Sequence, residues 1–121
     1  MLSPLALAFA GDAVYGLEVR KRLLLKANRP VNDLHSLSVK YVNAKSQAQA
    51  VKLLLPVFTE DEQTVFKRGR NAHTGHTPKN QSEADYHYAT GLEAVFGYLY
   101  LTGQTDRINE LFDIIWSEQI D

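Results

Sequence analysis

The sequence predicts an all-α domain of about six helices. Apolar residues recur at helical three- and four-residue spacing through most of the chain, and segments with the alternation of a β-strand are nearly absent. The chain has 121 residues, of which 45% are hydrophobic, so it can bury one core. We therefore expect residues 1–121 to form a single domain.

Capping residues and helix breakers set the expected boundaries. Helices are expected over about residues 5–25, 33–42, 44–55, 60–70, 83–102 and 106–116. The expected N-caps are Ser3 (followed by Pro4), Asn32 or Asp33, Thr59 (in a capping box with Glu62), Ser82 and Thr105. The expected breaks are residues 28–30, Pro56 and Gly103. Residues 71–81 are expected to form a loop, because they contain glycine and proline but no apolar periodicity.

Composition excludes several classes of protein. Cysteine is absent, which excludes disulfides, thiolate metal sites and a cysteine nucleophile and fits a reducing cytoplasm. The longest apolar stretch near the start, residues 5–10, is far shorter than a membrane span, and no signal-sequence pattern precedes it. We therefore expect a cytoplasmic protein with no membrane partner.

The net charge of −1 hides a strong asymmetry along the chain. Residues 1–81 carry 12 Lys/Arg and 6 Asp/Glu, a net charge of +6, whereas residues 82–121 carry 1 and 8, a net charge of −7. Residues 66–81 hold four cations and no anion. Such a distribution can place a polyanion on one face of the protein. The alternative is two solvated faces of opposite sign.

Asp12 has the most informative setting in the chain. It lies within the apolar segment 7–15, so we expect it on a buried helix face, where a carboxylate is costly unless it is paired or binds a metal. The neighbouring Gly11 costs about 1 kcal/mol of helix stability relative to alanine, a cost typical of close packing. An aspartate paired with a lysine or a backbone N–H is the structural alternative.

Glu93 repeats this arrangement in the apolar segment 89–100, again beside small residues. If the two helices pack against each other, the carboxylates of Asp12 and Glu93 come together and repel unless a cation lies between them. Hard oxygen ligands suit Mg²⁺ or Mn²⁺. The pattern therefore indicates a divalent-metal site.

Both segments resemble the ribonuclease III family. The segment Phe9-Ala10-Gly11-Asp12-Ala13-Val14 is similar to the family's signature helix, whose Phe-Leu-Gly-Asp core carries a metal-binding aspartate. The segment 92–101 is similar to the second acidic helix, in which Glu-Ala begins an apolar run and the glutamate binds metal. Matched residue by residue, Asp12 and Glu93 take the two metal-binding and catalytic positions.

The departures from the larger family members point to one subgroup. Where those enzymes have further acids, this chain has Leu5, Ala8 and Thr90. The reduced set resembles the Mini-ribonuclease III subgroup, although Gly16 stands where that subgroup usually has an acid. Supporting stretches are residues 32–35, 44–48, 67–72 and 78–80.

The resemblance implies a fold, an activity and an assembly. It implies a helical bundle like the ribonuclease III endonuclease domain, without a double-stranded-RNA-binding domain in these residues, assembled as a two-fold homodimer. The expected reaction is Mg²⁺-dependent hydrolysis of phosphodiester bonds in double-stranded RNA, with Mn²⁺ as a substitute metal and 23S ribosomal RNA precursor ends as the substrate. Leu5, Leu7 and Phe9 are the expected dimer surface, with a plain intramolecular core as the alternative.

The basic segment then becomes the expected RNA contact. Double-stranded RNA is recognised mainly through shape, phosphate and 2′-hydroxyl contacts, which suit Lys, Arg and Asn side chains. The expected RNA-binding residues are Lys45, Lys67, Arg68, Arg70, Asn71, Lys79 and Asn80. A solvated helix end followed by a polar loop is the alternative.

Other readings of the sequence stay open. His73 and His76 lie in the same polar loop, with His87 nearby, but the three have no fourth ligand and so suggest zinc only weakly. His35 could contact RNA or cap a helix. A non-catalytic RNA-binding or dimerisation module, having lost most family acids, is the main functional alternative. A helical scaffold for another protein is the third, and it predicts no affinity for RNA.

Overall fold

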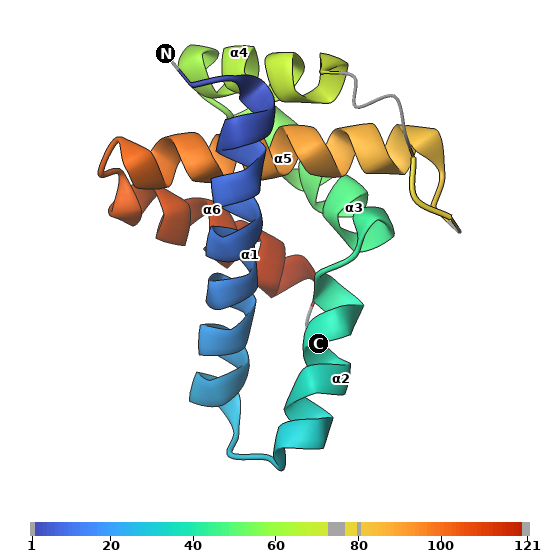
Figure 1. The fold of residues 1–121 in the computed structure, drawn as a ribbon. Helices are drawn as coiled ribbons and strands as arrows, with labels where there is room; N and C mark the ends of the chain where they lie inside the picture. Colours follow the sequence, from blue (N-terminus) through green and yellow to red (C-terminus); the bar gives the residue numbers. More distant parts are fainter. Residues whose placement is uncertain (1, 73–76, 80, 120–121) are drawn as a thin grey trace.

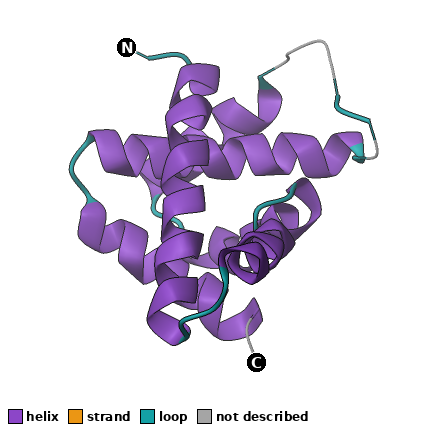
Figure 2. Ribbon diagram, turned by 60° about the horizontal axis from the view of Figure 1, so that its bottom comes forward, coloured by secondary structure: helices purple, strands orange, loops and turns teal. Residues whose placement is uncertain are grey.

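A computed structural model describes residues 2–72, 77–79 and 81–119 of the chain. Within these residues the protein is all-α, and Figure 2 shows helices and loops without a strand. The helices are α1 (Pro4–Lys26), α2 (Val31–Tyr41), α3 (Ala44–Leu54), the 3₁₀ segment η1 (Leu55–Val57), α4 (Glu60–Asn71), α5 (Glu83–Leu101) and α6 (Thr105–Gln119). The predicted fold class is confirmed.

Helix α5 is the centre of the bundle. It contacts α1, α3, α4 and α6, and its buried residues extend over most of its length. Figure 1 shows α5 lying across the molecule with α1 crossing it, while the second half of α1 and α2 extend away from the crossing as a helical hairpin. A side chain on the middle of α5 therefore lies where several helices meet.

Three predicted helix starts are confirmed by their capping hydrogen bonds. The Ser3 side chain accepts a hydrogen bond from the Ala6 backbone N–H at 3.1 Å, and the Ser82 side chain accepts one from Asp85 at 3.0 Å. Thr59 forms the predicted capping box, in which its hydroxyl accepts from the Glu62 N–H and the Glu62 carboxylate accepts from the Thr59 N–H. Each cap satisfies backbone donors that the first helical turn leaves free.

Two predicted caps are wrong. Helix α2 begins at Val31 directly after Pro30, and no side chain caps it, so neither Asn32 nor Asp33 has the expected role. Pro30 has the extended backbone of a residue that precedes a helix, and the exposed first turn of α2 leaves its free N–H groups to water. Helix α6 begins at Thr105 itself, so this residue is inside the helix and does not cap it.

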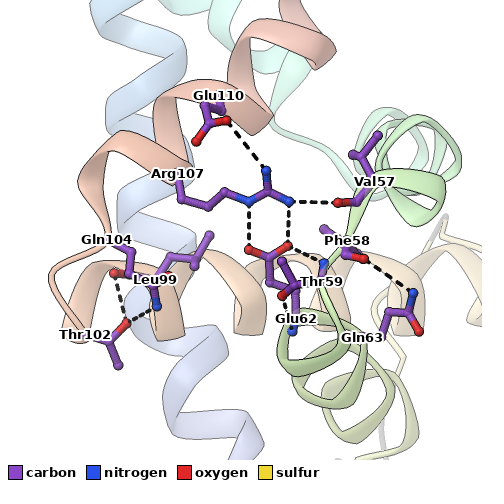
Figure 3. Close-up of polar contacts among 10 residues, drawn as sticks. All are labelled: Val57, Phe58, Thr59, Glu62, Gln63, Leu99, Thr102, Gln104, Arg107 and Glu110. Atoms are coloured by element: carbon purple, nitrogen blue, oxygen red, sulfur yellow. Dashed lines mark hydrogen bonds and ion pairs between the residues drawn. The ribbon is translucent and has the colours of Figure 1, made fainter.

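A buried ion pair joins α4 to α6 on the side of the bundle drawn in Figure 3. Glu62 is buried, and its two carboxylate oxygens accept hydrogen bonds from Arg107 Nε and Nη2, both at 2.9 Å. Arg107 Nη2 also donates to the Val57 carbonyl at 2.8 Å. Although burial raises the pKa of Glu62, the hydrogen bonds from Arg107 and Thr59 lower it more, so the carboxylate stays ionised at neutral pH.

Aromatic side chains fill the core between α1, α5 and α6. Tyr15 is buried and meets Phe96 and Phe112 edge-on, with ring centroids 5.4 and 5.0 Å apart. These contacts hold α1 against α5 next to the crossing. No helix among the described residues is long and apolar enough to cross a membrane.

Candidate metal site

Two glycines allow the backbones of α1 and α5 to touch. A Cβ atom added to Gly11 would lie 1.6 Å from the Glu93 carbonyl oxygen and 2.8 Å from the Gly97 nitrogen. A Cβ added to Gly97 would lie 2.0 Å from the Leu7 carbonyl oxygen. Any larger residue at either position would force the helices apart. The close packing predicted from Gly11 is therefore present, and it brings Asp12 beside the turn of α5 that carries Glu93.

The carboxyl groups of Asp12 and Glu93 lie close enough for Asp12 to alter the pKa of Glu93. The pKa of Glu93 is raised to about 8, first by burial, then by the hydrogen bond shared with Asp12 and by the Asp12 charge. A hydrogen bond from Gln47 opposes this shift and lowers the pKa. In the absence of a cation, Glu93 therefore keeps its proton at neutral pH, because burial and the neighbouring Asp12 charge both disfavour its ionised form.

Asp12 itself is exposed, which corrects the expectation of a buried aspartate. The residue of this turn that α5 covers is Gly11, and Asp12 lies at the edge of the crossing with its side chain accessible. Within the described part of the chain, no lysine or arginine forms an ion pair with Asp12. The paired-aspartate alternative is therefore not what the structure shows.

The pair of carboxyl groups suits a hard divalent cation. A cation between them removes the repulsion that raises the Glu93 pKa, and oxygen ligands are those that Mg²⁺ and Mn²⁺ prefer. Among the described residues, no group of three His, Cys, Asp or Glu could surround one ion. Protein ligands would then fill two positions, leaving the others to water and substrate oxygens, as Mg²⁺ readily accepts.

Gln47 is a site residue that the sequence analysis did not identify. Its side-chain nitrogen donates a hydrogen bond to Glu93 Oε2 at 3.3 Å, across 46 positions of sequence. The residue is buried on the face that α3 turns toward the core, with Ala48 and Val51. A glutamine in an otherwise apolar stripe was the available signal, but the stripe alone does not say which group the amide meets.

Thr90 occupies the position at which larger ribonuclease III enzymes have an acid. Its buried hydroxyl donates to the Tyr86 carbonyl at 2.9 Å, one turn earlier in the same helix. This hydrogen bond satisfies the hydroxyl within α5 and leaves Asp12 and Glu93 as the carboxyl pair of the crossing.

The cations predicted to bind RNA lie at the end of α4, at the start of α3 and in the segment before α5. Gly69 lets the last turn of α4 approach Gly91 and Ala94 of α5, so the cationic end of α4 lies near the turn that carries Glu93. The predicted RNA-binding residues Lys45, Lys67, Arg68, Asn71 and Lys79 are exposed.

Of four further residues named from the sequence, the structure describes only Arg70. Arg70 is half-buried: its guanidinium lies over the Phe66 ring, 5.7 Å from the centroid, and donates to the Asn71 side chain at 3.2 Å. Asn80, another predicted RNA contact, lies outside the described residues. The same is true of His73 and His76.

The proposed dimer surface is only partly as expected. Phe9 is 84% exposed and Leu5 is 37% exposed, so the intramolecular-core alternative does not hold for them. Leu7 is buried with Ala8 and Ala94 and is removed from the expected surface. The reason is the helical period, which places residues 5 and 9 on one face of α1 and turns residue 7 toward α5.

Comparison with known proteins agrees with this arrangement. The Ribonuclease III domain family matches residues 5–104. The chain is 47% identical to a Mini-ribonuclease 3 of Thermoanaerobacter sp., over 93% of this chain and 80% of that protein. It is 48% identical to the Mini-ribonuclease 3 of Symbiobacterium thermophilum, over 91% of this chain and 85% of that protein.

A solved structure has the same fold. A crystal structure of a Fusobacterium nucleatum protein superposes with a TM-score of 0.87 at 31% identity, covering 98% of this chain and 94% of that one. The family match includes both helices that carry the carboxyl pair. The chain therefore belongs to the ribonuclease III family and, within it, to the group of Mini-ribonuclease 3 proteins.

Proposed function

We propose that the protein is an endoribonuclease that hydrolyses phosphodiester bonds of double-stranded RNA with a divalent cation held by Asp12 and Glu93. The observation that carries the proposal is the backbone contact at Gly11 and Gly97, which brings Asp12 beside the turn of α5 that carries Glu93. Family membership supplies the reaction class. Mg²⁺ is the proposed metal and Mn²⁺ its substitute, because both prefer oxygen ligands.

The chain contributes rigid placement of two charges. When bound, the metal supplies an activated water and stabilises negative charge on the scissile phosphate. Glu93 is held from the core side by α5 and Gln47, whereas Asp12 presents its carboxylate from the exposed edge of α1. The contact at Gly11 and Gly97 fixes the distance between the two helices, and so the spacing of the ligands.

Exposed cations supply the affinity for RNA. The residues proposed to contact phosphate and 2′-hydroxyl groups are exposed. They are Lys67, Arg68 and Asn71 at the end of α4, together with Lys79 and Lys45. We include Arg70 and Asn80 in this proposed surface. Because such contacts do not distinguish bases, they favour recognition of a duplex by shape. This supports a structured duplex stem as substrate. The resemblance to Mini-ribonuclease III leads us to propose the ends of 23S ribosomal RNA precursor, in the cytoplasm, as that stem.

Residues 1–121 are proposed to act as one catalytic domain within a two-fold homodimer. Phe9 and Leu5 leave apolar surface exposed on α1. Burying this surface against a second copy offers a favourable hydrophobic contribution. Phe9→Glu should convert the dimer to monomer in light scattering at micromolar concentration; a parent protein that is already monomeric contradicts the dimer.

The experiment that tests the function is a cleavage assay on long double-stranded RNA. The protein with Mg²⁺ should release short duplex products, and the same reaction in EDTA should release none. Single-stranded RNA of the same sequence serves as the substrate control. A protein that binds the duplex but never cuts it, at any Mg²⁺ or Mn²⁺ concentration, is the non-catalytic module instead. The same assay on precursor 23S ribosomal RNA tests the proposed substrate.

A further inference from the structure

Gln47 places a polar side chain in the core, directly against the candidate metal site. The residue is only 4% exposed, and α3 packs it against α5 among Ala44, Ala48 and Val51. Burying an unpaired amide costs about 1–3 kcal/mol, so an apolar residue would serve packing alone better. The amide nitrogen donates a hydrogen bond to Glu93 Oε2.

We propose that Gln47 is a positioning residue, whose side-chain amide holds the Glu93 carboxylate in the orientation in which it binds the metal. The inference rests on the proposed function of Asp12 and Glu93 as metal ligands. Gln47 itself is not a ligand in this arrangement, because the group that faces Glu93 is a donor.

The chemistry of an amide explains the direction of this contact. An ionised carboxylate can only accept hydrogen bonds, so the NH₂ end of Gln47 must face Glu93 once the metal is bound. The hydrogen bond from Gln47 can persist, since it needs no proton on the carboxylate. It then restricts rotation of the Glu93 carboxylate and leaves its other oxygen available to the metal.

The start of α3 is anchored, so the Gln47 amide is held at a defined place. Asn43 caps α3 by accepting from the Ser46 N–H at 2.9 Å, and its amide donates to the Val39 and Lys40 carbonyls at the end of α2. The Gln47 N–H donates to the Asn43 carbonyl at 2.9 Å. This network fixes the first turn of α3 between α2 and α5. A residue held so firmly is suited to orient a neighbour.

The test replaces the amide while keeping the volume. Gln47→Met removes the donor but preserves length in an apolar setting, a type of exchange that cores tolerate. The matched control is Gln63→Met on α4, which removes a similar glutamine hydrogen bond, 3.4 Å long, to the Phe58 carbonyl. Mn²⁺ affinity is measured by electron paramagnetic resonance, beside the dependence of cleavage on Mg²⁺ concentration and RNA binding in EDTA.

The expected results separate orientation from packing. Mn²⁺ should bind Gln47→Met about 10-fold to 100-fold more weakly than the parent, as is typical when a partner of a metal ligand is removed. Raising Mg²⁺ should restore most of kcat, and RNA binding in EDTA should not change. Gln63→Met should match the parent in every measurement. Unchanged Mn²⁺ affinity in a folded Gln47→Met protein overturns the proposal, and so does an equal loss of RNA binding in EDTA.

A measurement on the parent protein covers the case in which Gln47→Met does not fold. The side-chain NH₂ resonances of Gln47 should shift as Mg²⁺ is titrated, in step with metal occupancy, whereas those of Gln63 should not. Resonances that stay unmoved at saturating Mg²⁺ overturn the role of Gln47. The failure of the proposed function has a different signature: Mn²⁺ binds neither the parent nor Glu93→Gln, or binds both equally.

Discussion

Replacement of Gly11 by alanine should break the site by separating its two helices. The added Cβ would lie 1.6 Å from the Glu93 carbonyl oxygen, where ordinary contact begins at 3.4 Å. The helices must therefore move apart by up to 1.8 Å (3.4 − 1.6) at this point. The obstacle is backbone, so no side-chain rotation can relieve it.

The energetic balance favours a clear loss of stability. Overpacking a core contact costs about 1–3 kcal/mol or more, while alanine returns about 1 kcal/mol of helix propensity. Because the clash is with backbone, the cost lies at the upper end of this range, and the net loss of about 2 kcal/mol lowers Tm by roughly 8 °C in a chain of this size. Displacing one metal ligand by more than about 1 Å should also lower the cleavage rate by on the order of 100-fold.

Gly16→Ala is the matched control on the same helix. Its Cβ would meet only the Arg20 guanidinium, 2.8 Å away, at the far end of a flexible exposed side chain. This variant should keep its activity and gain up to about 1 kcal/mol of stability. Circular dichroism melts and cleavage rates decide the matter. A Gly11→Ala protein as stable and active as the parent would refute the reasoning that the glycine contact sets the spacing of Asp12 and Glu93.

Three further predictions follow from other contacts. Arg107→Met should remove both hydrogen bonds from Arg107 to the buried Glu62 carboxylate and lower the free energy of unfolding by about 3–5 kcal/mol. The variant should have a lower Tm and normal cleavage below that temperature, and an unchanged Tm contradicts the buried ion pair. In EDTA, the free energy of unfolding should fall as pH rises from 4.5 toward 8, because folded Glu93 keeps the proton that the unfolded chain releases. Mg²⁺ or Glu93→Gln should remove this pH dependence, and denaturant melts that show the same dependence in all three cases count against the raised pKa of Glu93. Arg70→Ala with Lys79→Ala should flatten the dependence of log K on log salt by about 2, one for each lost phosphate contact. Lys52→Ala, an exposed cation toward the other end of α3, should not change it, and equal slopes in all proteins place the RNA elsewhere.

Local chemistry explains which parts of the fold were predictable. Ser3, Thr59 and Ser82 cap helices with their own side chains, so the residues within one turn contain the needed information. Helix α2 begins after Pro30 without a side-chain cap, so the polar residues Asn32 and Asp33 gave a misleading signal for its start. Apolar spacing likewise identified α1 but not its buried side, because apolar residues lie on several faces of this helix.

The candidate site was predictable in its carboxylates but not in its surroundings. Asp12 and Glu93 stand out as acids in apolar segments beside glycines, and family resemblance assigned them a common role. The exposure of Asp12 depends on which face of α1 packs against α5, and this contact buries Gly11 but not Asp12. The contact from Gln47 depends on how α3 packs against α5, and no local pattern encodes a pairing between residues that distant.

The measurement that tests the central claim most directly is cleavage of long double-stranded RNA by Glu93→Gln in Mg²⁺. The substitution keeps the shape of the side chain and removes the charge that holds the cation. The variant should fold and bind RNA like the parent, since RNA affinity comes mainly from cations elsewhere. It should release no more product than the parent does in EDTA. Near-normal Mg²⁺-dependent cleavage by folded Glu93→Gln contradicts the account.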